Sequence, residues 1–106
     1  MARTRQARLS DLFANVCATA AITGRDRAID LGRGVRLVVR VRDGRTVVSL
    51  ARPRIPISPS EETTFRVNCQ FPKHAERWPD HGQRRVQHGG HTWFQVVFRW
   101  KEEPSQ

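Results

Sequence analysis

The chain has 106 residues and carries 19 Lys and Arg against 10 Asp and Glu, which gives a formal net charge of +9. This length suits one domain with a modest core and excludes two large ones. The charge favours a polyanionic partner, such as nucleic acid, an anionic membrane surface or an acidic protein.

The cysteine count and the hydropathy pattern narrow the class further. Cys17 and Cys69 are the two cysteines, too few for a disulfide scaffold, so we expect an intracellular, cytoplasmic protein. No run approaches the roughly 18 apolar residues of a membrane span. We therefore expect no membrane partner.

The N-terminal segment predicts a basic arm followed by a helix. Residues 1–8 contain Arg3, Arg5 and Arg8 and no acid, which indicates a flexible arm. Ser10 is suited to cap a helix over residues 11–23 that Gly24 would end. The apolar residues of that helix recur at helical spacing: Leu12, Phe13, Val16, Cys17, Ala20 and Ala21. A secretory signal is the alternative, but Asp11 and Asn15 interrupt the apolar run.

Residues 35–42 and 45–52 alternate between apolar and polar side chains around the pair Asp43-Gly44. Asp-Gly between alternating segments is typical of a β-hairpin with a two-residue turn, because both turn residues need positive φ. This turn would place Leu37 opposite Leu50 and Val39 opposite Val48. The other face of the hairpin would then carry arginines, with small or aliphatic neighbours: Arg36, Arg40, Arg42 and Arg45.

The second half of the chain predicts one more helix and one more strand. Ser58, Pro59 and Glu61 form a capping-box pattern for a helix over residues 59–69, which would bury Phe65 and Cys69. Residues 72–90 hold prolines, glycines and histidines, and indicate a long loop. Residues 92–101 predict a strand with an aromatic face, and residues 102–106 a polar tail.

These elements predict a small α+β domain over residues 9–101. Its three-stranded antiparallel sheet, made of the hairpin and the C-terminal strand, would be packed on one face by two helices, in the order α-β-β-α-β. The predicted core is thin: Leu12, Phe13, Val16, Leu37, Val39, Val41, Val48, Leu50, Phe65, Phe94, Val96 and Phe98.

The arginines beside a tryptophan on the open face carry the functional prediction. We expect a non-enzymatic nucleic-acid-binding protein, DNA or RNA, that contacts mainly phosphates. No acid is expected on that face. The alternative to a binding surface is that these arginines form the ordinary solvated exterior of the sheet. The predicted binding residues are those of the arm, the hairpin and the last strand: Arg3, Arg5, Arg8, Arg36, Arg40, Arg42, Arg45, Trp93 and Arg99.

Two binding modes fit this surface. The hairpin could enter a duplex groove as a ribbon, since its arginines are densest at the tip. The sheet could instead be a single-strand platform, with Trp93 stacking a base. By a narrow margin the charge at the tip favours the duplex.

The sequence is also compatible with three alternatives to nucleic-acid binding. The tryptophans and arginines also suit a protein–protein module, either a subunit of a nucleoprotein assembly or a small inhibitor docking on an acidic groove. A ribonuclease would use histidine as general acid or base, but no catalytic motif supports it. A zinc site in and around the long loop is a further alternative, although the spacing of its ligands is not that of a zinc finger. The residues that would bind the ion are Cys69, His74, His81, His88 and His91. No cofactor is expected.

Overall fold

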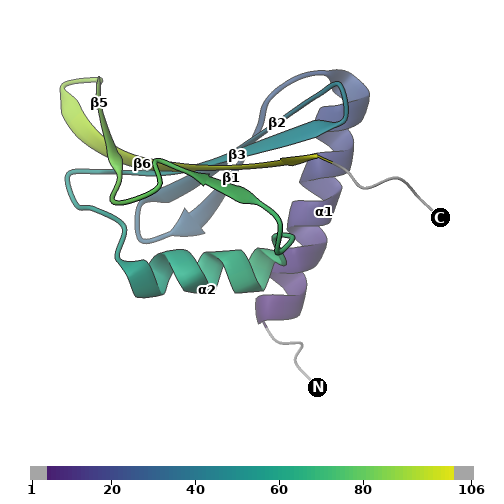
Figure 1. The fold of residues 1–106 in the computed structure, drawn as a ribbon, viewed down its shortest axis with the longest axis horizontal. Helices are drawn as coiled ribbons and strands as arrows, with labels where there is room; N and C mark the ends of the chain where they lie inside the picture. Colours follow the sequence, from purple (N-terminus) through teal and green to yellow (C-terminus); the bar gives the residue numbers. More distant parts are fainter. Residues whose placement is uncertain (1–4, 102–106) are drawn as a thin grey trace.

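A computed structural model describes residues 5–101, with side chains described from residue 9 onward. It contains two helices and six strands (Figure 1). In chain order the elements are α1 (Arg5–Thr23), β1 (Arg27–Gly32), β2 (Val35–Arg42), β3 (Arg45–Pro53), α2 (Pro59–Cys69), β4 (Glu76–Trp78), β5 (Arg84–His88) and β6 (His91–Lys101).

All strands belong to one antiparallel sheet with the order β1-β2-β3-β6-β4. The long strand β6 pairs with β3 along one edge, and on its other edge with β5 at residues 91–95 and with β4 at residues 97–99. The α+β class is confirmed, whereas the three-stranded sheet and the order α-β-β-α-β are wrong. Three strands were missed, because β1, β4 and β5 are short and lack a clear alternation of apolar residues.

The hairpin forms as the sequence predicts. Leu37 pairs with Leu50, Val39 with Val48, and Arg42 with Arg45. Asp43 and Gly44 have φ values of 53° and 74°, the left-handed conformations that a two-residue turn of this type requires. The register is therefore fixed locally, and it sends the aliphatic side chains to one face and the arginines to the other.

Helix α1 is longer than its sequence indicates. It begins at Arg5 rather than near Ser10, so the predicted cap is wrong and the predicted arm overlaps with the helix at residues 5–8. Residues 1–4, with Arg3, lie outside the described part of the chain. Gly24 ends the helix as expected: its φ is +67° and its N–H donates to the carbonyl of Ala20.

Helix α2 has the predicted bounds and the predicted capping box. The Ser58 hydroxyl accepts from the backbone N–H of Glu61, and the Glu61 carboxylate accepts from the N–H of Ser58. Gln70 follows in the left-handed conformation and closes the helix. Cys69 is buried at its end, as the sequence predicts.

Both helices pack on the same face of the sheet, and the core lies between the layers (Figure 1). Leu12 was expected in this core but is 46% exposed, because α1 turns Phe13 inward instead. Phe94 is half-buried and lies outside the buried cluster. The buried hydrophobic residues are Phe13, Ala20, Ile29, Val35, Leu37, Val39, Val48, Leu50, Ile57, Cys69, Val96 and Phe98.

Two ion pairs fasten α2 to the sheet. The Arg52 guanidinium donates to both carboxylate oxygens of Glu61 at 2.8 Å. Arg77 on β4 likewise donates to Glu62, at 2.8 and 2.9 Å. All four side chains are mostly buried, so each pair satisfies charges that would be costly to leave alone. None of the four was singled out for an ion pair from sequence.

The segment 72–90 is not the uniform loop that its composition indicates. It contains β4 and β5, which extend the sheet beyond β6. The Gln83 side chain also ties it to the chain before α2: its oxygen accepts from the N–H of Ile57 at 3.0 Å, and its amide donates to the carbonyl of the same residue. A polar side chain of this stretch, which has few apolar residues, is thus bonded to the backbone of a distant segment.

Candidate functional site

The sheet face opposite the helices is the candidate site. Both helices cover the other face, so no described helix or strand packs over this one (Figure 1). Its floor is half-buried and small or aliphatic: Val38, Val47, Ser49, Ala51 and Val97. Strand register places basic side chains around that floor: Arg36, Arg40, Arg42, Arg45, Arg84, Arg99 and Lys101.

This face is not free of acids, so the expectation of a carboxylate-free surface is wrong. Asp26, just before β1, accepts from Arg40 Nε and Nη2 at 3.1 and 3.0 Å. It also forms a longer ion pair with Arg42, at 3.8 Å. The hydrogen bond from Arg40 is the largest cause that lowers the pKa of Asp26. Two of the predicted binding arginines are thus partly neutralised.

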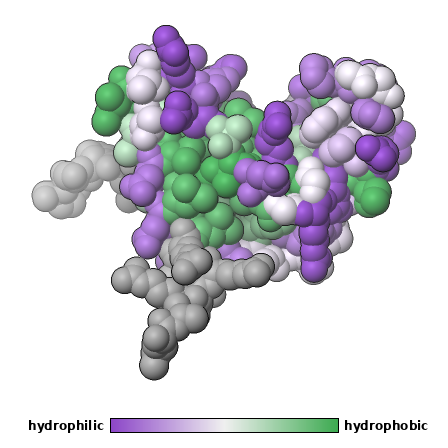
Figure 2. All heavy atoms as spheres, turned by 180° about the vertical axis from the view of Figure 1, so that it is seen from behind, coloured by the Kyte–Doolittle hydropathy of each residue, from purple (hydrophilic) through white to green (hydrophobic). Residues whose placement is uncertain are grey.

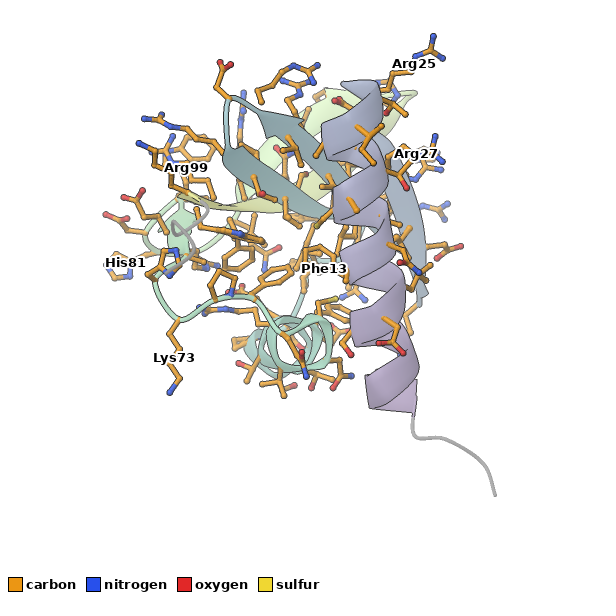
Figure 3. The ribbon with its side chains drawn as sticks, turned by 90° about the vertical axis from the view of Figure 1, so that its right-hand side faces the viewer. Phe13, Arg25, Arg27, Lys73, His81 and Arg99 are labelled. Carbon is orange, nitrogen blue, oxygen red and sulfur yellow. The ribbon has the colours of Figure 1, made fainter. Side chains whose placement is uncertain are left out.

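Three of the predicted arginines differ from Arg40 and Arg42 in their pairing with acids. Arg36, Arg45 and Arg99 are exposed, and within the described residues none of them forms an ion pair. Asp30 lies opposite Arg36 in the register, and Glu76 lies opposite Arg99. Arg99 lies on β6 between β3 and β4, and Figure 3 shows it pointing away from the core.

The hairpin tip and the end of β6 enclose a shallow cationic pocket of about 440 Å³. Its lining is largely basic: Arg40, Arg42, Asp43, Arg45, Val47 and Lys101. Arg42 and Arg45 are cross-strand partners, and like charges in that position repel one another. An anion between them would relieve the repulsion.

Trp93 lies at the opposite end of β6 from the hairpin tip. Its ring is half-buried, and its indole N–H donates to the carbonyl of His88 at 3.2 Å. Arg84 stacks over Trp78 on the neighbouring strands, 5.4 Å from the ring centroid. Arg84 and Trp78 were not among the predicted binding residues, because their short strands were not recognised.

The arm residues remain predictions. The backbone of Arg5 and Arg8 belongs to the first turns of α1. Their side chains, and the whole of Arg3, lie outside the described part of the structure. The structure therefore gives no position for the charges that the arm was expected to contribute.

The cysteine and histidines weighed as zinc ligands are not brought together. Cys69 is buried at the end of α2, whereas His88 and His91 flank the β5–β6 turn. In the part of the chain that the structure describes, no group of three or more His, Cys, Asp or Glu side chains is close enough to hold a metal ion. Burial raises the pKa of the Cys69 thiol to about 12, which disfavours the thiolate that zinc requires.

An apolar groove of about 850 Å³ runs beside α1, on the side away from the open face. Phe13, Cys17, Val41, Cys69 and Trp100 are among its lining residues. Hydrophobic side chains also gather within polar surroundings on the face seen from behind in Figure 2. This groove is the structural feature that would suit a protein partner.

Comparison of the chain with protein-family models, with curated proteins and with solved structures found no match. None of the described helices is long and apolar enough to cross a membrane.

Proposed function

We propose that this protein binds nucleic acid, without catalysis, through the open face of its sheet. One observation carries the proposal: Arg36, Arg45 and Arg99 project from an uncovered face that also presents Trp93, and no described carboxylate forms an ion pair with any of the three. Guanidinium groups bind phosphates by charge-assisted hydrogen bonds, and the net charge of +9 would attract a polyanion over a distance.

The extent of the surface also supports the proposal. Arg45 and Ala51 are six residues apart on β3, so about 20 Å of strand separates the tip from the Trp93 end. Cations occur at both ends, with Arg45 and Lys101 at one and Arg36 and Arg84 at the other. A backbone with regularly spaced phosphates can contact both ends at once, whereas a small anion can contact only one.

Fluorescence anisotropy with labelled DNA and RNA at several salt concentrations tests this function. Binding through phosphates should weaken steeply between about 50 and 200 mM salt. The double variant R36T/R99T should lose most of its affinity, because both guanidiniums lie on the proposed surface. Threonine suits an exposed strand, so the variant should keep its melting temperature.

The matched control is R27T/K73T, which removes the same charge from elsewhere. Figure 3 shows Arg27 beyond α1 and Lys73 on the side of α2, both away from Arg99. The control should bind almost as well as the wild type. Equal losses in the two double variants would show that net charge, rather than this face, determines binding, and salt-independent affinity would contradict the proposal.

Binding of a protein partner is the second candidate function, and the apolar groove beside α1 favours it. Ala21, near the C-terminal end of α1, lines this groove and is exposed, and exposed apolar surface commonly marks an interface. A21K should weaken such an interaction and leave nucleic-acid binding unchanged, which separates the two candidates.

A further inference from the structure

A small pocket on the open face lies at the Trp93 end of the sheet, where β2, β3, β6 and β5 adjoin. Its volume is about 240 Å³, below the range of roughly 300–1,000 Å³ for drug-sized ligands. Its lining residues are Arg36, Ala51, Val86, His88, Trp93 and Gln95. The pocket is therefore of a size that suits one planar ring system.

The strand pairing explains why a hollow forms here. Ala51 lies between Arg36 and Gln95 in the register of β2, β3 and β6, and its methyl group leaves space that a longer side chain would fill. Val86 pairs with Trp93 and forms the neighbouring wall. The indole N–H bond to the His88 carbonyl holds the Trp93 ring in place, so an aromatic surface is presented without an ordering cost on binding.

The polar groups of the pocket complement the edge of a nucleobase. The Gln95 amide donates to the Ser49 hydroxyl at 2.8 Å, and its side-chain carbonyl oxygen is an acceptor. Arg36 supplies donors that no described carboxylate engages in an ion pair. Nucleobase edges carry both carbonyl acceptors and amino donors, and Arg36 can equally contact the adjoining phosphate.

We propose that this pocket receives one unstacked nucleobase, so that the protein binds single-stranded nucleic acid in preference to duplex. The inference rests on the proposed function and specifies its ligand. The bases of a duplex are stacked on one another, and only their edges reach the grooves. A single strand can turn a base out onto an aromatic ring while its phosphates contact the surrounding arginines.

Three DNA ligands of equal length test the proposal by anisotropy: a single strand, the duplex of the same sequence, and a strand of abasic sites with the same phosphates. The wild type should bind the single strand tighter than the abasic strand by about 5- to 150-fold, the value of one stacked base. The duplex should bind more weakly than the single strand.

Two variants locate the effect. A51L fills the pocket and W93L removes the ring, and each should lower single-strand affinity to the level of the abasic strand while abasic binding stays unchanged. F94L is the matched control, because Phe94 is next to Trp93 on β6 but lies on the other face of the sheet, outside the pocket. It should retain the preference for bases. Melting temperatures of all three variants identify any loss of fold.

The outcomes separate the inference from the proposed function. Equal affinity for the single strand and the abasic strand, both salt-dependent, would overturn the base pocket and leave phosphate binding intact. A base preference that F94L abolishes and W93L retains would also overturn it. No salt-dependent binding to any of the three ligands would overturn both.

Discussion

Asp26 holds Arg40 by two hydrogen bonds of 3.0 and 3.1 Å, and so withdraws part of the positive charge from the hairpin. The two residues are 14 positions apart in the chain. Asp26 belongs to the connection that leads from α1 into β1, and the β1–β2 pairing brings it to the arginine. The charge of the candidate surface is therefore set by tertiary structure as well as by composition.

D26N should strengthen nucleic-acid binding. The substitution removes the carboxylate charge that engages Arg40 and Arg42, so both guanidiniums become available for phosphates. We expect a severalfold rise in affinity at low salt and a log–log salt slope steeper by about 0.7–0.9 for each added phosphate contact.

D11N makes the same charge change on α1 and is the control for D26N. Its affinity should rise much less, since no described basic residue of the open face pairs with Asp11. Unchanged or weaker binding by D26N would show that Arg40 and Arg42 do not take part. Anisotropy with one labelled strand across a salt series measures both variants.

E61Q should destabilise the fold by about 2–3 kcal/mol in urea unfolding. Glutamine can still accept in the capping box, so the substitution isolates the ion pair with Arg52, whose side chain is only 10% exposed. Removing one partner of such a pair leaves the other charge without compensation. E76Q, at an exposed position of β4, should change the unfolding free energy by less than about 0.5 kcal/mol. An equal loss in both variants would contradict the role given to the ion pair.

Glu61 should also make the fold sensitive to acid. The Arg52 hydrogen bond, followed by that of the Ser58 backbone, lowers the pKa of Glu61 from 4.5 to about 2. Between these values the unfolded chain binds a proton that the folded chain does not, so stability is complete above pH 4.5 and falls as pH approaches 2. The loss attributable to this group is at most about 3 kcal/mol.

Urea unfolding at a series of pH values measures this dependence. E61Q should have a flatter profile than the wild type over that interval, because the variant has no carboxyl group there to protonate. Parallel profiles would place the acid sensitivity in other carboxylates.

The two cysteines should differ in reactivity toward iodoacetamide at mildly alkaline pH. Burial raises the pKa of Cys69 to about 12, and the thiolate is the reactive form. Cys17 is half-buried on α1, so we expect it to be alkylated first and Cys69 only after unfolding. Mass spectrometry of digested protein identifies the modified residue, and C17S should show no rapid modification. Rapid labelling of Cys69 in the folded protein would contradict the burial.

R45T should raise the melting temperature in the absence of ligand while it weakens nucleic-acid binding. Arg45 faces Arg42 across the hairpin, and threonine removes the repulsion between like charges. Added nucleic acid should stabilise the wild type more than the variant. A thermal melt with and without a short oligonucleotide measures both effects, and a lower ligand-free melting temperature for R45T would contradict the prediction.

The sequence determined the elements whose signals are local. Asp43-Gly44 specified both the hairpin and its register, because a two-residue turn fixes the pairing of the strands that it joins. Ser58, Pro59 and Glu61 specified the start of α2 through a capping box that needs only residues of that turn. The inward face of the last strand followed from its alternation, so much of the sheet core and the position of Trp93 were predictable.

Only the tertiary structure decided the rest, because those features depend on partners distant in the chain. Strands β4 and β5 are too short and polar to be recognised alone, and they form against β6, which offers them a free edge. Arg52 and Arg77 are counted as cations in the sequence, yet each is paired with a carboxylate of α2. Asp26 reached the arginine face by the same kind of long-range pairing. Composition counts charges, whereas their availability depends on which groups the fold brings within hydrogen-bond distance.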